Sequence, residues 1–268
     1  KIGHTMPLGL PINCTQEITP SSALNEGIRF FETIKSDINA QGYYAFRRDR
    51  SQEDIDFVEK SLDELKYALD KGEAKDFRIY HEGLKGTPWE AAFGYSTKTF
   101  GGFFHINLQY NGDGLEDLFL FLERFFENNA ASYAIGYKCA DVYDAYHYAI
   151  GGNMVKLFSW ENAMAFNKEV DGRFQGQARF NSTKLRLVYP VNVINSSHLD
   201  IMIGESTLCE AIQKNDWGIL KKINSVNERW FWIVQDNQLE SINNELGMHG
   251  VLISWKKFSP RRGSNRLP

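Results

Sequence analysis

The sequence has little cysteine: Cys14, Cys139 and Cys209 are the 3 thiols in 268 residues. Their odd number and wide spacing argue against a disulfide framework, and no two of them have the spacing of zinc ligands. Such cysteine usage is typical of a reducing compartment. We therefore expect a cytoplasmic protein without a disulfide scaffold.

Long apolar runs are also lacking. No stretch approaches the roughly 20 consecutive apolar residues that a membrane-spanning helix requires, and the first residues lack the basic, apolar and small-residue regions of a signal peptide. We expect no membrane segment and no signal peptide.

Acidic residues are missing from the C-terminal end. Five basic residues and no acid follow Glu245, so residues 1–245 carry a formal charge of −9 although the whole chain carries −4. An acidic body repels phosphate backbones and attracts basic proteins. The charge pattern therefore predicts a basic protein partner and no nucleic-acid partner.

Aromatic residues, by contrast, are abundant at 14% of the chain. Alternating apolar residues predict strands at Gly42–Arg47, Phe77–Tyr80, Trp89–Tyr95, Phe103–Tyr110 and Tyr133–Tyr137, and at Ile28–Ile34. Apolar residues at helical spacing predict helices from Ser51 to Leu69, where Ser51 and Asp54 would form a capping box, and from Asp113 onward. Strand, helix, strand units recur near 43–80, 103–137 and 229–255. The predicted fold class is α+β, with a mixed, largely antiparallel sheet and packed helices built from repeated strand-helix-strand units.

The expected organisation has five parts, although residues 28–256 could equally form one continuous domain. The parts are an irregular N-terminal lead-in (1–27), an N-terminal α+β half (28–152), a connecting region with one short helix at Trp160–Asn167 (153–180), a C-terminal α+β half with a strand at Val251–Trp255 (181–256) and a basic tail (257–268).

One segment, Asp141–His147, concentrates carboxylates, tyrosines and a histidine. On a helix, Asp144 and His147 would be neighbours at i, i+3, which suits a metal pair or an oriented base. Two ligands without a third make a weak metal site. The simpler interpretation is a helix that starts at Asp141 as its cap and packs its tyrosines.

No recognisable catalytic motif occurs elsewhere, so the sequence predicts no enzyme and no cofactor. Acidic groups beside aromatic ones suit a binding surface for lysine and arginine side chains. The candidate binding residues of this kind are Asp113, Glu116, Asp117, Asp141, Asp144, Trp160 and Glu161.

The chain reads Leu-Val-Tyr-Pro-Val-Asn-Val-Ile-Asn-Ser-Ser-His-Leu at 187–199, Trp-Phe-Trp-Ile-Val at 230–234 and Gly-Val-Leu-Ile at 250–253. These stretches, with Ala134–Tyr137 upstream, resemble the type VI secretion immunity family, whose members neutralise toxins delivered between bacteria and are often encoded beside nuclease toxins. The resemblance covers about 77–255. We assign Val188, Tyr189, Pro190 and Asn192 structural roles.

The resemblance implies an immunity protein that binds a cognate antibacterial toxin, with a nuclease as the expected effector, and occludes its active site or substrate path. Two alternatives stay open. One is a metal-dependent hydrolase or nuclease that uses Asp144 and His147, and the other is a scaffold or regulatory module without a toxin partner.

Overall fold

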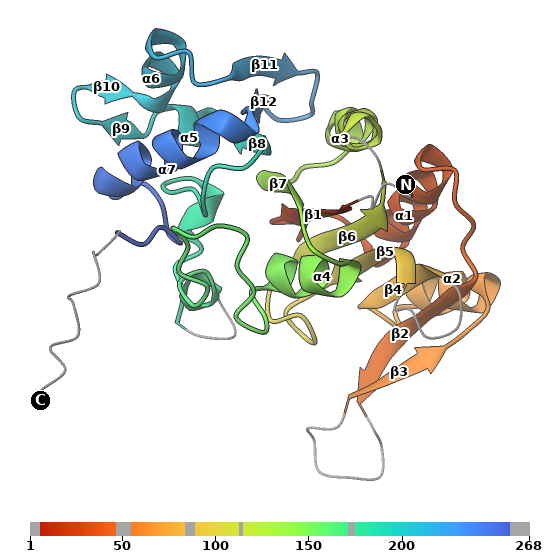
Figure 1. The fold of residues 1–268 in the computed structure, drawn as a ribbon. Coiled ribbons are helices and arrows are strands. Elements are labelled where there is room, and N and C mark those ends of the chain that lie inside the picture. The colour runs from red at the N-terminus through yellow and green to blue at the C-terminus, as the bar shows by residue number, and fades with distance from the viewer. Residues whose placement is uncertain (1–5, 47–54, 84–88, 113–114, 171–174, 258–268) are drawn as a thin grey trace, which may run out of the picture.

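The structure is a computed structural model that describes residues 6–46, 55–83, 89–112, 115–170 and 175–257. Its centre is a ten-stranded sheet in the order β11-β12-β8-β7-β1-β6-β5-β4-β2-β3, in which every neighbouring pair is antiparallel (Figure 1). The predicted α+β fold class is confirmed. No helix in the described part of the chain is long and apolar enough to cross a membrane.

The strands are β1 (Pro7–Asn13), β2 (Ala40–Phe46), β3 (Ile55–Glu59), β4 (Phe77–Glu82), β5 (Trp89–Ser96), β6 (His105–Asn111), β7 (Tyr133–Lys138), β8 (Val191–Asn195), β9 (Met202–Ile203), β10 (Ser206–Thr207), β11 (Ile219–Ile223) and β12 (Arg229–Ile233). The α-helices are α1 (Pro20–Thr33), α2 (Leu62–Asp70), α3 (Glu116–Asn128), α4 (Val142–Ile150), α5 (Ser196–Leu199), α6 (Leu208–Lys214) and α7 (Leu239–Met248). Short 3₁₀ turns lie at Asn167–Glu169, Arg179–Asn181 and Asp236–Gln238.

Helices cover both faces of the sheet, so the central strands β1, β6 and β7 are buried on both sides. Alternate residues of β7 show the division: Ala134 belongs to the core under α1, α2 and α3, whereas Ile135 and Tyr137 belong to the core under α4 and the C-terminal helices. One sheet therefore contains strands from both predicted halves, and the division into halves stays a prediction.

Strand β1 corrects the expectation of an irregular lead-in. Proline and glycine in 7–13 indicated a loop, yet this segment is fully buried between β6 and β7. Pro11 fits because its register with β7 is interrupted there, so the missing N–H breaks no pair. Gly9 is required because a Cβ at this position would collide with the ring of Tyr137.

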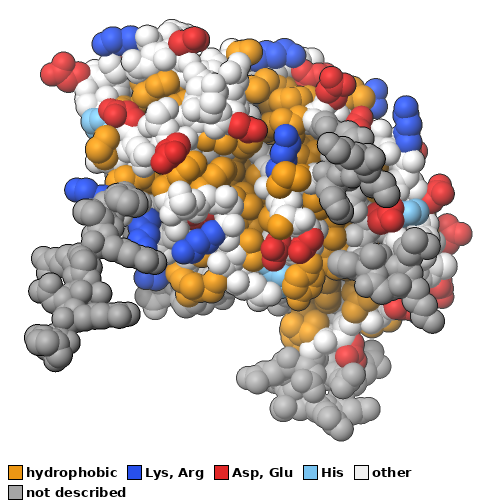
Figure 2. Space-filling model, viewed as in Figure 1, with side chains coloured by type: hydrophobic (Ala, Val, Ile, Leu, Met, Phe, Trp, Pro, Cys, Tyr) orange, Lys and Arg blue, Asp and Glu red, His pale blue; other side chains and the backbone are white. Residues whose placement is uncertain are grey.

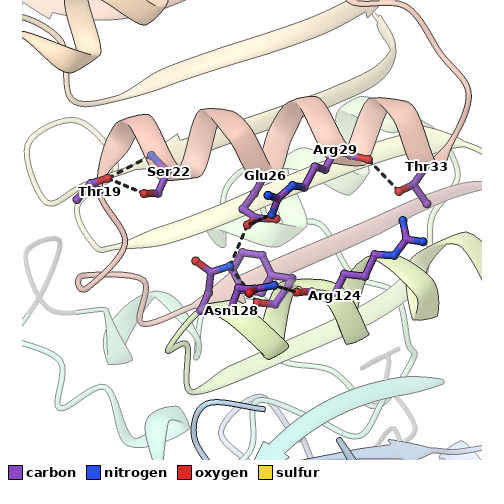
Figure 3. A network of polar contacts seen from close by, with 9 residues as sticks. Thr19, Ser22, Glu26, Arg29, Thr33, Arg124 and Asn128 are labelled. Carbon is purple, nitrogen blue, oxygen red and sulfur yellow. Dashed lines mark hydrogen bonds and ion pairs between the residues drawn. The ribbon is translucent and has the colours of Figure 1, made fainter. Parts of the chain in front are cut away.

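Two further elements differ from their predictions. Residues 28–34, expected as a strand, form the end of α1 and its C-cap, Ile34; the helix begins with Thr19 as N-cap and Pro20 in its first turn. Glu26 of α1 is buried and accepts hydrogen bonds from Arg29 Nη1 (2.9 Å) and from Asn129 Nδ2 (3.1 Å), next to the end of α3 (Figure 3). Because Asn129 is the C-cap of α3, this hydrogen bond connects α1 to the end of α3.

The helix expected from Ser51 begins only at Leu62. Residues 55–59 instead form β3, and the predicted capping pair of Ser51 with Asp54 lies outside the described residues. Ser61 and Glu64 form the capping box of α2. By contrast, the strands predicted at 42–47, 77–80, 89–95 and 133–137 are confirmed as β2, β4, β5 and β7 over their described residues. The strand predicted at 103–110 is confirmed as β6 from His105 onward, and the helix predicted after Asp113 is confirmed as α3.

The C-terminal part is held by buried polar side chains. Asn192 accepts a hydrogen bond from Tyr189 N and donates to the carbonyls of Tyr189 and Trp232, which confirms its structural role in the turn before β8.

Val251–Trp255 is not a strand: it makes only isolated bridges, Leu252 with Leu185 and Trp255 with Glu161. The helix expected at Trp160–Asn167 is likewise absent from these described residues, where turns and the first 3₁₀ residue occur.

Candidate protein-binding surface

Helix α4 carries the cluster that the sequence singled out. Asp141 is its N-cap and accepts a hydrogen bond from Asp144 N at 2.7 Å, while Gly151 ends the helix in the left-handed conformation with φ 70°. The simpler interpretation, a capped helix with packed tyrosines, therefore describes this segment. Its capped first turn presents the exposed Asp141 and the half-buried Asp144 on one side.

A buried polar layer lies on the sheet near α4. Arg78 of β4 is 3% exposed and donates from Nη1 to Asn107 Oδ1 (2.5 Å) and from Nη2 to Gln109 Oε1 (3.0 Å). Its guanidinium lies 4.5 Å from the ring centroid of Tyr146 of α4, and the rings of Tyr80 and Trp89 are also close, at 5.4 and 5.7 Å. Cation–π contacts to three rings offset part of the desolvation of this charge and fix the position of the rings above it.

These rings belong to a continuous aromatic surface. Ring contacts with centroid separations of 4.7–6.3 Å lead from Phe46 through Phe100, Tyr44, Phe57, Tyr80 and Trp89 to Tyr143 and Tyr146. We call the following residues the aromatic surface: Tyr44, Phe46, Ile55, Phe57, Tyr80, Trp89, Phe100, Tyr143 and Tyr146. They come from β2, β3, β4, β5, the β5–β6 loop and α4.

Several members of the aromatic surface are open to solvent. The exposed fractions are 51% for Phe46, 48% for Ile55, 36% for Phe57 and 48% for Tyr143. A hollow of about 120 Å³ opens among Tyr44, Ile55, Phe100 and Tyr146, which is room for one side chain. Figure 2 shows hydrophobic side chains gathered over α4 and toward the β2–β3 hairpin, with acidic side chains next to them. Contiguous exposed apolar area of this kind marks binding surfaces in soluble proteins.

The predicted site residues divide into separate groups. Asp141 and Asp144 border the aromatic surface through Tyr143 of the same helix. Glu116 and Asp117 are exposed on the first turn of α3, which packs with α1 on the opposite face of the sheet. Asp113 lies outside the described residues. The structure therefore brings two of the predicted acids to one surface and separates the α3 pair from them.

Glu161 requires a correction, because it is fully buried rather than part of an exposed patch. It accepts a hydrogen bond from Tyr148 Oη (2.7 Å) and faces Arg186, whose guanidinium stacks on Tyr148 at 3.9 Å from the ring centroid. Burial raises the pKa of Glu161, and the charge of Arg186 opposes that rise. Trp160 is half-buried and stacks on Phe158 with centroids 4.9 Å apart. This cluster stabilises the core under α4.

A metal site at Asp144 and His147 would need a third ligand, and none of the described residues supplies one. Among the described residues no group of three histidine, cysteine, aspartate or glutamate side chains is placed to hold an ion. His147 packs against Tyr143 and Tyr146. Burial lowers its pKa, and the nearby Asp144 carboxylate partly opposes that effect. The imidazole is therefore part of the packing of α4.

Sequence reasoning missed the contribution of the β2–β3 hairpin to this surface. Phe46 pairs with Ile55 and Tyr44 with Phe57 across the two strands, so all four side chains share one face. The alternation of Ile55 and Phe57 is the signal in the sequence for this strand, but Ile55, Val58 and Leu62 also match a helical spacing, which favours the helix prediction.

No protein-family profile matches the chain, and no curated protein matches its sequence. Among solved structures, the Pseudomonas aeruginosa T6SS protein PA0821 is similar in fold. The superposition has a TM-score of 0.53 with 11% sequence identity, and it covers 96% of this chain and 77% of that chain. At this identity the likeness concerns the fold alone.

Proposed function

We propose that this protein is an immunity protein that binds a cognate antibacterial toxin through the aromatic surface and occludes the toxin's active site or substrate path. The observation that carries the proposal is the exposed aromatic surface bordered by Asp141 and Asp144. The fold likeness to a type VI secretion protein and the sequence resemblance to immunity proteins of that system support it.

The aromatic surface has the physical character of an interaction hot spot. Large rings bury much area at low conformational cost, and they dominate binding energy where a rim excludes water. The buried Arg78 contacts three of the rings on their inner side, which favours a surface that is ordered before the partner binds. A preformed surface loses little entropy on binding, which suits a tight inhibitor.

Charge supports a basic partner. Residues 1–245 carry a formal charge of −9, and acids stand next to the exposed rings. Enzymes that act on nucleic acids carry basic surfaces because their substrate is a polyanion. A nuclease toxin that uses such a surface would be attracted to this protein and blocked at its substrate path.

The test is neutralisation in cells. We would co-express the product of the reading frame adjacent to this protein's gene with the wild type, with Tyr143→Ala or with Met248→Ala. Met248 is a matched control, because it is 65% exposed at the end of α7 and is no part of the aromatic surface. We expect growth with the wild type and the control, and loss of growth with Tyr143→Ala. Equal killing with and without the wild-type protein would refute the function.

A further inference from the structure

The two outer edges of the ten-stranded sheet differ in character. Edge strands expose unpaired backbone groups, and proteins commonly protect them with lysine. β11 carries Lys221 and Lys222, which pair with Glu123 (2.7 Å) and Glu228 (2.5 Å). The other edge, β3, has the sequence Ile-Asp-Phe-Val-Glu without a basic residue and exposes Ile55 and Phe57. Among the described residues of the two edge strands themselves, only those of β11 therefore carry this protection against an added strand.

The backbone of β3 shows which groups face the free edge. Lys60 N donates to Gln41 O, so the pair formed by Lys60 and Gln41 is hydrogen-bonded. Such pairs alternate along an antiparallel ladder, and therefore Val58 and Asp56 also point their backbone groups toward β2. The N–H and C=O groups of Phe57 and Glu59 point away from β2. In the described part of the chain no strand pairs with that edge.

The side chains of the same strand belong to the aromatic surface. Phe57 contacts the rings of Tyr44 and Tyr80, with centroids 5.3 and 6.0 Å away. Ile55 lines the hollow of about 120 Å³ beside Tyr44 and Tyr146. A strand added to β3 would thus extend both the hydrogen-bonded ladder and the aromatic surface, and its own side chains on that face would lie beside Ile55 and Phe57.

We infer that β3 is a docking edge that accepts an extended segment of the toxin as an eleventh strand. This inference rests on the proposed function. The segment has apolar side chains opposite Ile55 and Phe57 and a lysine or arginine beside Glu59. Main-chain hydrogen bonds supply affinity in this mode of recognition, and the alternate side chains supply specificity.

Charge favours such a partner over a second copy of this chain. Self-pairing of two β3 strands would bring two copies of Glu59 to one short ladder, and β3 itself supplies no basic residue to offset them. Like charges placed together across strands destabilise the pairing. A basic segment removes that repulsion and matches the acidic body.

The experiment combines an edge variant with a backbone measurement. Phe57→Lys places a lysine on the β3 edge, and Ile219→Lys places one on the β11 edge, where Ile219 is 63% exposed. Circular dichroism and thermal unfolding check that each variant folds. We expect Phe57→Lys to weaken binding of the adjacent-frame product by about 30-fold or more, as for a hot-spot residue, and Ile219→Lys to change it by less than about threefold.

Hydrogen exchange of the wild type tests the same point without a mutation. On addition of the adjacent-frame product, the amides of Phe57 and Glu59 should exchange at least about tenfold more slowly, since they gain hydrogen bonds. The amides of Asp56 and Val58 are already bonded to β2 and should change less.

The outcomes separate this inference from the proposed function. If the product binds but neither Phe57→Lys nor the Phe57 and Glu59 amides respond, the docking edge is wrong and the immunity function stands. If the product does not bind the wild type, both are wrong. A dimer of the free protein that Phe57→Lys dissociates would assign the edge to a second copy and overturn the inference.

Discussion

His198 illustrates how a single buried residue links this fold to pH. The ring is fully buried, with Nδ1 accepting a hydrogen bond from Asn195 N (3.3 Å) and Nε2 lying 2.8 Å from the carbonyl oxygen of Phe180, to which it donates. Both contacts require the neutral ring with its proton on Nε2. Burial is the main cause that lowers its pKa from 6.5 to about 4.

The lowered pKa of His198 predicts acid destabilisation. Well above pH 6.5 the ring is neutral in both states, and the lowered pKa has no effect on stability. As pH falls from about 6.5 to about 4, the unfolded chain binds a proton that the folded protein does not, so the free energy of unfolding should fall by about 3 kcal/mol. Denaturant titrations across this range should show that fall in the wild type and a shallower one in His198→Gln. Equal slopes in both proteins would contradict the assignment.

Glu161 and Arg186 form the second residue-scale case. Glu161→Gln removes the carboxylate that faces the buried guanidinium, and an uncompensated buried charge costs about 3–5 kcal/mol. We expect the single variant to lose stability of that order. Adding Arg186→Met should restore part of it, because the orphaned charge is then gone. Denaturant unfolding of both single variants and the double variant measures the coupling, and strictly additive losses would show that the two groups do not interact.

At the scale of elements, α4 combines a structural cap with the binding role that we propose for it. Asp141→Ala removes both the charge and the hydrogen bond to Asp144 N, and loss of such a cap costs about 1 kcal/mol. Asp141→Asn keeps a capping side chain and removes only the charge. We therefore expect Asp141→Ala to lower the free energy of unfolding by about 1 kcal/mol and Asp141→Asn to change it little, as measured by denaturant unfolding. Equal stabilities would mean that the cap contributes nothing.

The same two variants separate the charge of Asp141 from the helix it caps. If the carboxylate contacts a basic partner, Asp141→Asn should weaken toxin binding although α4 remains intact. Binding that falls only with Asp141→Ala would instead assign the effect to the geometry of α4.

The elements differ in how far the sequence predicts them, for physical reasons. β6, α3 and β7 combine clear apolar periodicity with turn residues, so local preference and tertiary packing agree. In β1 they conflict: two prolines and a glycine indicate a loop, yet the segment is buried between β6 and β7, where the interrupted register tolerates Pro11. In β3 the pairing with β2 decides between a helical and an alternating pattern that both fit Ile55–Val58.

The candidate site was predictable only in part. The local pattern of 141–147 predicts the capped helix and its acids, because all of that information is contiguous. The surface around it also includes Phe46 and Phe57, which join it through the long-range pairing of β2, β3 and β4. For Glu161 the sequence predicts an exposed acid because the residue follows an aromatic one, Trp160. The residue is buried against Arg186, and that contact depends on chain segments far from it in the sequence.

At the scale of the whole molecule, the distribution of charge predicts salt-dependent binding. An acidic body that attracts a basic toxin over several ångströms should lose that attraction as ions screen it, since the Debye length falls from about 14 Å to about 6 Å between 50 and 300 mM salt. We expect the dissociation constant to rise about tenfold over this range, mainly through slower association. Stopped-flow kinetics would measure the association rate at each salt concentration. A salt-independent association rate would contradict a role for electrostatic attraction.

The most direct measurement is the affinity of the purified protein for the product of the adjacent reading frame, by titration calorimetry. Wild type, Tyr143→Ala and Met248→Ala would be compared at one salt concentration. We expect tight one-to-one binding for the wild type and Met248→Ala, and a loss of about 2 kcal/mol or more of binding free energy for Tyr143→Ala. Tight binding that is equal in all three proteins would contradict the claim that the aromatic surface holds the toxin, and no heat of binding for the wild type would contradict the immunity function itself.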